Sequence, residues 1–393
     1  MSDALYLAWR YLASHRLKTA VLVASIALTT LIPLTLMLLV RQSAEAIGAR
    51  AERTPLVLGA KGSPLELTLS TLYFTTDVQE TVPARLADEI NASGLAQAIP
   101  VHAMFRAGGA PVIGTSVEYL ELRQLEVSEG RVFARLGECV VGATAAQRLA
   151  VGPGDALMTE SENAFDLAGT YPLRMQVTGV LAPSGSADDD AVIADVTTAW
   201  IAAGLAHGHD DLADPASRSG VLRREGDVIT ANASVVMYNE VTEANIDSYH
   251  FHGDTADFPL TAVIAVPPDR KGRSLLLGRY GTPTSSWLIV EPEEVLADLM
   301  ATVFTVERYV VAALIVVALA TAAVMVLVFD LSRRLRRGEM ETMFKIGASR
   351  ARIVSVLAME VVLVLVLGAG LGSGLAFAVG AFGPAFTRLL VSA

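Results

Sequence analysis

The chain has 393 residues, of which 52% are hydrophobic and 18% are charged, and its formal net charge is −11 at pH 7. Typical globular domains are about 25% charged, so the composition excludes an ordinary soluble protein and indicates long apolar segments beside a domain of mixed composition. The acidic balance argues against nucleic acid as a partner. Because Cys139 is the only cysteine, no intrachain disulfide can form.

Residues 1–40 have the features of a membrane anchor. Residues 1–18 place Tyr6 and Trp9 at helical spacing among basic side chains, which predicts a cytoplasmic amphipathic segment in contact with membrane lipids. Residues 19–40 are uncharged and exceed the apolar region of a signal peptide, which is about 7–15 residues long. We therefore expect a retained transmembrane helix over residues 19–40.

Residues 41–291 have the mixed composition of a large folded domain, and their patterns predict an α+β fold. A Gly-, Asp-, Ser- and His-rich stretch over residues 204–227 indicates a long loop. The expected elements are strands at Ala98–Ala107, Pro111–Ser116 and Met175–Leu181, and a helix over Pro83–Asn91 with its proline in the first turn.

Four of the six histidines form two His-x-His pairs within this domain. On a strand, residues i and i+2 point the same way, so one pair could offer two imidazoles to Zn²⁺, and a nearby carboxylate could supply a third ligand. The alternative is two solvated loops that bind no metal. A metal site here could be either structural or open and exchangeable. The candidate ligands are His207, His209, His250, His252 and Asp254.

The C-terminal quarter alternates apolar and basic segments. We expect a stalk helix over residues 292–308 that runs into a transmembrane helix at 309–329. Residues 330–352 form a basic loop, residues 353–382 a third transmembrane helix, and residues 383–393 a short tail.

The distribution of charge sets the orientation of these segments. The basic loop should be cytoplasmic by the positive-inside rule, whereas residues 42–308 carry twice as many acidic as basic side chains. The predicted fold class is therefore a membrane α-helical protein with three transmembrane helices and a large extracytoplasmic α+β domain.

Two features inside the third apolar segment invite a functional interpretation. Small residues four apart let membrane helices approach closely, so a run of alternating glycines predicts a helix-packing face. Glu360 is either a functional intramembrane carboxylate or, as we favour, the partner of an arginine in the basic loop. The glycines are Gly368, Gly370, Gly372 and Gly374.

The order of segments, together with four stretches, resembles the MacB/FtsX-type ABC transporter permeases, which include the lipoprotein-releasing permeases. The fourth stretch, between two membrane helices, is the most diagnostic. The chain departs from the family in having Glu341 where a glycine is common, and we expect it to lack the family's fourth membrane helix. The stretches are Leu7–Leu12 with Arg16–Lys18, Glu129–Phe133 with Glu138–Gly142 and Ala146–Asp155, Val177–Gly185, and Glu339–Ile353.

The resemblance implies a permease subunit of the bacterial inner membrane that dimerises with itself or a related chain and works with a cytoplasmic ABC ATPase. It implies coupling of ATP hydrolysis, on that separate subunit, to motion of the extracytoplasmic domain. The basic loop would then contain the ATPase-coupling element; the alternative is a loop that only obeys the positive-inside rule. The coupling residues would be Glu339, Glu341, Phe344, Lys345, Gly347 and Arg350.

Two other functions remain open from the sequence. An FtsX-like regulatory protein would activate a periplasmic partner protein without transport, and a membrane-anchored sensor or enzyme would need no ATPase. No nucleotide-binding motif is present, since Gly59-Ala-Lys-Gly-Ser lacks the spacing of a phosphate loop. No pairing of a nucleophile with a base stands out, so we do not expect an enzyme.

Overall fold

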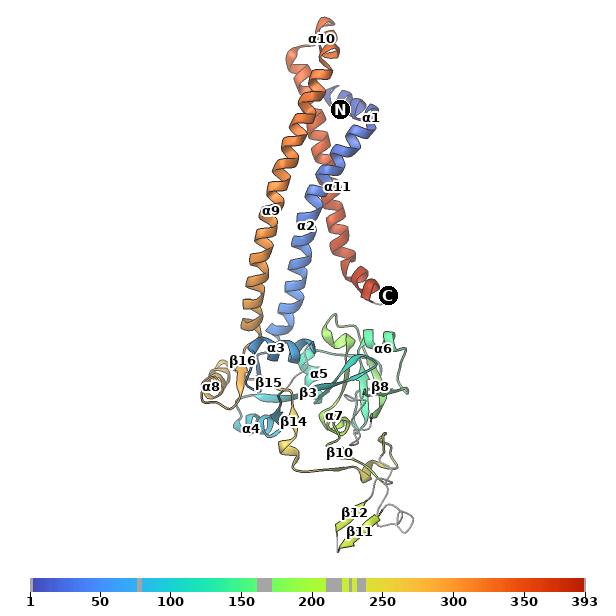
Figure 1. Ribbon diagram of the computed structural model, residues 1–393, viewed down its shortest axis with the longest axis vertical. Coiled ribbons are helices and arrows are strands. Elements are labelled where there is room, and N and C mark those ends of the chain that lie inside the picture. Colours follow the sequence, from blue (N-terminus) through green and yellow to red (C-terminus); the bar gives the residue numbers. More distant parts are fainter. Residues whose placement is uncertain are drawn as a thin grey trace. The chain divides into compact units, whose positions relative to one another are not determined.

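The computed structural model describes residues 3–75, 80–160, 172–209, 221–225, 228–231 and 238–391. These residues form two compact units, each with its own packing. The helical unit comprises Met1–Ala46 and Leu299–Ala393, and the sheet unit comprises Ile47–Asp298. Figure 1 shows the long helices and the sheet in the colours of the sequence.

Among the described residues, three helices are long and apolar enough to cross a membrane, over Arg16–Glu52, Pro292–Leu335 and Arg350–Ala381. The expected stalk and second apolar segment form one uninterrupted helix, and the third long helix continues to Val391, through most of the expected tail. The helices of this part of the chain are α1 (Asp3–Ser14), α2 (Arg16–Glu52), α9 (Pro292–Leu335), α10 (Arg337–Lys345) and α11 (Arg350–Val391).

A small apolar core holds the helical unit together. Leu22 and Ile26 of α2 and Val364 of α11 are buried there, and Met325 and Phe329 of α9 pack against them. Contacts of this kind supply dispersion energy, which matters because lipid tails remove the hydrophobic driving force between membrane helices.

The sheet unit is α+β, as the sequence predicts. Its main sheet has ten strands in the order β16-β1-β15-β3-β4-β9-β6-β8-β5, with β7 also paired to β8. The pairs β4–β9 and β6–β8 are parallel and the others are antiparallel. The strands are β1 (Leu56–Gly59), β3 (Gln97–Ala107), β4 (Ala110–Thr115), β5 (Val127–Gly130), β6 (Glu138–Val141), β7 (Ala156–Met158), β8 (Arg174–Leu181), β9 (Val192–Asp195), β15 (Ala262–Val266) and β16 (Leu288–Val290).

Three two-stranded ladders and several helices complete the sheet unit. The ladders are β2 (Val82–Pro83) with β14 (Pro259–Leu260), β10 (Ala206–His207) with β13 (His250–Phe251), and β11 (Val221–Glu225) with β12 (Val228–Ala231). The helices are α3 (Pro64–Tyr73), α4 (Arg85–Ser93), α5 (Val117–Arg123), α6 (Ala143–Leu149), α7 (Val196–Ala202) and α8 (Arg270–Tyr280), with short 3₁₀ turns η1 (Ala187–Asp190), η3 (Ile246–Ser248) and η4 (Thr255–Asp257).

Two apolar clusters form the core of this unit. One gathers Leu56, Leu58 and Ile90 with side chains of α8 and β15, and the other gathers Cys139 and Met175 with side chains of α6, α7 and β9. Full burial of a large aliphatic side chain contributes about 1.5–3 kcal/mol, so these clusters can stabilise the unit without a disulfide.

Most of the predicted elements in this unit are confirmed. β3 and β4 flank Gly108 and Gly109, whose positive φ angles of 56° and 76° suit a two-residue hairpin. The prediction for Pro83 is wrong, because it pairs with Pro259 in the β2–β14 ladder and the helix begins only at Arg85. The expected loop over residues 204–227 contains β10 and β11, while its residues 210–220 and 226–227 lie outside the described residues.

Candidate functional site

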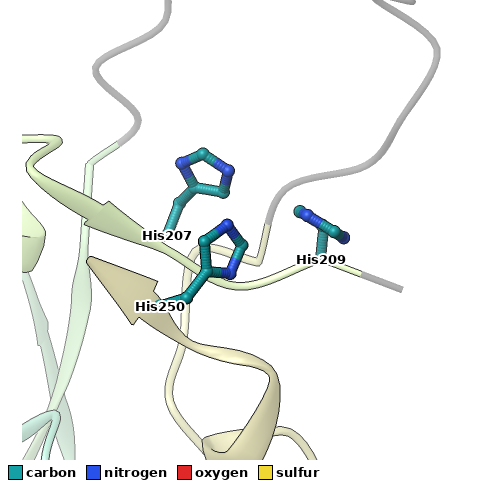
Figure 2. A group of neighbouring side chains, drawn as sticks. All are labelled: His207, His209 and His250. Carbon is teal, nitrogen blue, oxygen red and sulfur yellow. The ribbon is translucent and has the colours of Figure 1, made fainter. Parts of the chain in front are cut away.

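One histidine from each pair lies in the ladder of β10 and β13. His207 and His250 are direct partners in the antiparallel register, although 43 positions separate them in the sequence. Figure 2 shows their imidazoles on neighbouring strands, with His209 farther along the chain from β10. The sequence left open whether the fold brings the pairs together, and the structure does so.

Local packing explains why the imidazoles gather on one side of this ladder. Phe251, between His250 and His252, packs against both apolar clusters of the core, so the alternation of a strand turns the two histidines outward. Gly208, between His207 and His209, leaves room for an aromatic neighbour, since a Cβ there would lie 2.7 Å from the Tyr249 ring.

The four imidazoles form a compact cluster, which we call the histidine cluster: His207, His209, His250 and His252. His207, His209 and His250 each offer a ring nitrogen, and these atoms lie within 4.8 Å of one another. The His252 Nε2 atom is 3.2 Å from His207 Nδ1 and 3.4 Å from His207 Nε2. His207 and His209 are half-buried, whereas His250 and His252 are exposed.

The surroundings of His207 favour its neutral imidazole. Burial, followed by the neighbouring imidazoles, lowers the pKa of His207 from 6.5 to about 4. Asp254, which the sequence suggests as a ligand, is not in the three-residue group, and its Oδ1 caps η4 by accepting a hydrogen bond of 3.0 Å from Ala256 N. Within the described residues, the group of possible ligands thus contains only imidazoles.

A second candidate site is the short helix α10, between α9 and α11. No side chain of α10 is buried, and Glu339, Glu341, Phe344 and Lys345 are exposed. Phe344 is 53% exposed, which leaves an aromatic ring available beside charged side chains.

The ends of α10 explain how the chain turns toward α11. Gly347 has a φ of 101°, where a glycine is favoured over any residue with a Cβ. The backbone N–H of Ala348 donates to Met343 O at 3.0 Å, which closes the end of the helix. Arg350 begins α11 and lies over the Phe344 ring, 5.8 Å from its centroid.

Glu360 pairs with an arginine of the loop, as the sequence favoured. Its carboxylate accepts two hydrogen bonds from Arg336 Nη1, at 2.9 and 3.2 Å, and the Glu360 side chain is only 3% exposed. The Arg336 guanidinium also lies 3.6 Å from the centroid of the Tyr11 ring, so this ion pair links the loop to α1 and α11.

The alternating glycines of α11 divide into two sets. Gly368 and Gly372 face α2, because a Cβ added there would lie 2.6 Å from Ile26 Cβ and 2.5 Å from Ala27 O, respectively. A Cβ on Gly370 or Gly374 would meet nothing within 4 Å. The close approach to α2 therefore involves only one of the two sets.

A buried polar cluster at the end of α2 could not be predicted from the sequence. The Arg50 side chain donates to Asp188 of η1 through both of its terminal nitrogens, and Nη2 also donates to the Tyr119 hydroxyl at 3.0 Å. That hydroxyl donates to Asp188 Oδ1 at 2.8 Å. Beside them, Arg123 Nη1 donates to Thr54 Oγ1 at 2.8 Å.

The charges of this cluster are held deep in the sheet unit. Asp188 is 1% exposed and Arg50 is 7% exposed. Burial by itself would raise the pKa of Asp188, but the hydrogen bonds and positive charge of Arg50 hold it below its usual value. Neither residue stands out in the sequence, since Arg50 lies in a polar helix end and Asp188 opens a run of three aspartates.

Comparison with known proteins gives two family matches. Residues 34–234 match the model of the MacB-like periplasmic core domain, and residues 311–388 match that of the FtsX-like permease C-terminal region. No curated protein matches the chain.

Several solved structures are similar to this chain at low identity. The periplasmic region of MacB from Actinobacillus actinomycetemcomitans is 10% identical with a TM-score of 0.34, over 63% of this chain and 92% of that one. The extracellular domain of the noncanonic ABC-type transporter YknZ from Gram-positive bacteria is 12% identical with a TM-score of 0.31, over 60% of this chain and 98% of that one.

Proposed function

The chain belongs to the family of MacB/FtsX-type ABC transporter permeases, bacterial membrane proteins with a periplasmic domain, and we propose that it couples ATP hydrolysis by a separate subunit to motion of that domain. Permeases of this family generally work with an ABC ATPase subunit and are not enzymes themselves. In this proposal α2, α9 and α11 span the inner membrane, with the sheet unit outside and α10 in the cytoplasm.

One observation carries the proposal: two of the long helices connect to neighbouring strands of one sheet. α2 ends at Glu52 and β1 begins at Leu56, while β16 ends at Val290 and is followed at once by α9. β1 and β16 are paired, with Leu58 opposite Ile289. A change in the separation or tilt of α2 and α9 would therefore act on two hydrogen-bonded strands rather than on flexible loops.

The buried polar cluster of Arg50, Tyr119 and Asp188 supports the same mechanism. Arg50 lies in the last turn of α2, and its bonds to Asp188 and Tyr119 attach that turn to η1 and α5. Buried, charge-assisted hydrogen bonds are short and directional, so they resist a change in the angle of the helix end. Motion of α2 would then displace these elements of the sheet unit together with β1.

Helix α10 is the element that we assign to ATPase docking. Its exposed Phe344 offers an apolar anchor, and the surrounding charges offer orientation, which is the usual composition of a protein contact. Because α10 ends at Lys345 and α11 begins at Arg350, only a few residues separate the docking helix from a long helix. A displacement of α10 would therefore be transmitted to α11 through this short linker.

The test uses the full chain in lipid nanodiscs with its ABC ATPase subunit. Phe344→Asp should weaken co-purification of the ATPase, because it places a charge where an apolar contact is needed. Gly347→Ala should reduce ATP turnover at preserved expression, since a left-handed alanine costs about 1 kcal/mol. Gly338→Ala is the matched control, because Gly338 has open space around it and no positive φ.

The outcomes separate the alternatives. Unchanged ATPase binding and unchanged turnover in both variants would refute the docking role of α10. If no ABC ATPase associates with the wild-type chain in nanodiscs, the coupling function itself is wrong.

A further inference from the structure

We propose that the histidine cluster is a binding site for a divalent transition-metal cation, with Zn²⁺ as the first candidate. This site goes beyond the coupling function and does not depend on it. The clustering of four of the chain's six histidines in and beside a two-stranded ladder is the starting observation.

The spacing of the ring nitrogens fits one ion. Zn–N bonds of about 2.0–2.1 Å in a tetrahedral site place the ligand atoms roughly 3.3 Å apart. The His252 Nε2 atom lies 3.2 Å and 3.4 Å from the two ring nitrogens of His207. The ring nitrogens that His207, His209 and His250 offer are farther apart, within 4.8 Å of one another. Small rotations of the exposed His250 ring would bring these nitrogens to the spacing that one ion requires.

One imidazole is already oriented by a neighbour. His250 Nδ1 lies 3.1 Å from the backbone oxygen of Ser248, an acceptor that fixes the proton on Nδ1. With the proton on Nδ1, the Nε2 lone pair of His250 can coordinate an ion. Metal-binding histidines commonly donate their second N–H to a neighbouring acceptor in this way.

The ligand set indicates the class of ion. Imidazole suits Zn²⁺, Cu²⁺ and Ni²⁺, whereas Mg²⁺ and Ca²⁺ require oxygen ligands. Neither a carboxylate nor a thiolate joins the cluster within the described residues, and Cys139 is buried in the core. A hydrogen bond between neutral His207 and His252 is the competing explanation of their short distance, and it predicts no metal affinity.

The position of the site indicates exchange rather than a structural role. His250 and His252 are exposed, so an ion can enter and leave without opening the sheet unit. Residues 42–308 carry twice as many acidic as basic side chains, which raises the local concentration of cations.

The experiment is calorimetric titration of the full chain in detergent with ZnCl₂, using a purification tag that contains no histidine. We expect about one Zn²⁺ per chain with a Kd on the order of 1 μM or below. His250→Ala/His252→Ala should weaken binding at least about 100-fold, because two of the four imidazoles of the cluster are lost. His15→Ala, which changes an exposed histidine of the helical unit, should bind Zn²⁺ like the wild type.

A second readout identifies the ligands. Tetrahedral Co²⁺ bound by nitrogen ligands should give visible absorption bands with the wild type that the double variant lacks. If folding of the double variant is in doubt, His252→Gln alone keeps a polar side chain at an exposed position and should still weaken binding. A wild-type Kd near 1 mM, or equal affinity in the double variant and the wild type, would overturn the proposal.

Discussion

Arg50 and Asp188 form a buried ion pair across 138 positions of sequence, and it attaches the last turn of α2 to η1. Two charges removed from water are stable only when they satisfy one another, so the pair constrains where the helix end can lie. Gly142 contributes to the fit, because a Cβ there would lie 2.1 Å from the backbone oxygen of Asp188.

Asp188→Asn should destabilise the sheet unit by about 3–5 kcal/mol, because Arg50 would keep its charge in a buried position without a partner. Arg50→Met/Asp188→Leu should cost less than Asp188→Asn, since no unpaired charge remains. The measurement is thermal unfolding followed by tryptophan fluorescence, as Trp200 and Trp287 pack in the sheet unit. Glu243→Gln, which removes only the exposed ion pair with Arg135, is the control and should change little. A double variant less stable than Asp188→Asn would contradict the explanation.

His102 should make the sheet unit sensitive to acid. It is 1% exposed, neither ring nitrogen has a hydrogen-bond partner within the described residues, and burial lowers its pKa from 6.5 to about 4. Because the unfolded chain binds the proton first, the free energy of unfolding should fall as the pH drops from about 6.5 toward 4, by up to roughly 3 kcal/mol. Unfolding at pH 7 and pH 5 should show a smaller loss in His102→Leu than in the wild type. An equal loss in both would mean that other groups control the acid response.

The two sets of glycines in α11 should respond differently to alanine. Gly372→Ala should destabilise the packing of α11 on α2 by about 1–3 kcal/mol, because the added Cβ would overlap the backbone oxygen of Ala27. Gly370→Ala should be neutral or stabilising, since its Cβ meets nothing and alanine favours a helix. Unfolding of the full chain in mixed micelles measures both, and equal effects would show that close approach is unimportant.

The membrane topology can be tested by cysteine labelling of variants that still contain the native Cys139. Cys139 is fully buried, and burial followed by the charge of Glu138 raises its pKa to about 12, so it should stay unreactive in the folded protein. In spheroplasts, an impermeant maleimide should label Glu89→Cys on α4. Ile346→Cys, beside α10, should be labelled only after the membrane is opened. Labelling of Ile346→Cys in intact spheroplasts would reverse the proposed orientation.

The long apolar helices could be predicted from the sequence alone, because a single segment of about twenty apolar residues crosses a bilayer only as a helix, with its backbone hydrogen bonds satisfied internally. The sequence also determined the hairpin of β3 and β4, where Gly108 and Gly109 specify the turn locally. The pairing of Glu360 was expected as well, since a charge in an apolar segment needs an opposite charge and the nearest lie in the basic loop.

The relationships between distant segments became visible only in the folded chain. Nothing near Arg50 in the sequence indicates Asp188, and nothing near His207 indicates His250, because each pairing depends on how the whole sheet is assembled. Pro83 shows the same limit on a smaller scale: its sequence suits a helix start, yet a ladder with Pro259 places it in a strand. Local patterns fix the period of an element, whereas contacts across the fold are set by packing of the complete chain, which no short stretch of residues encodes.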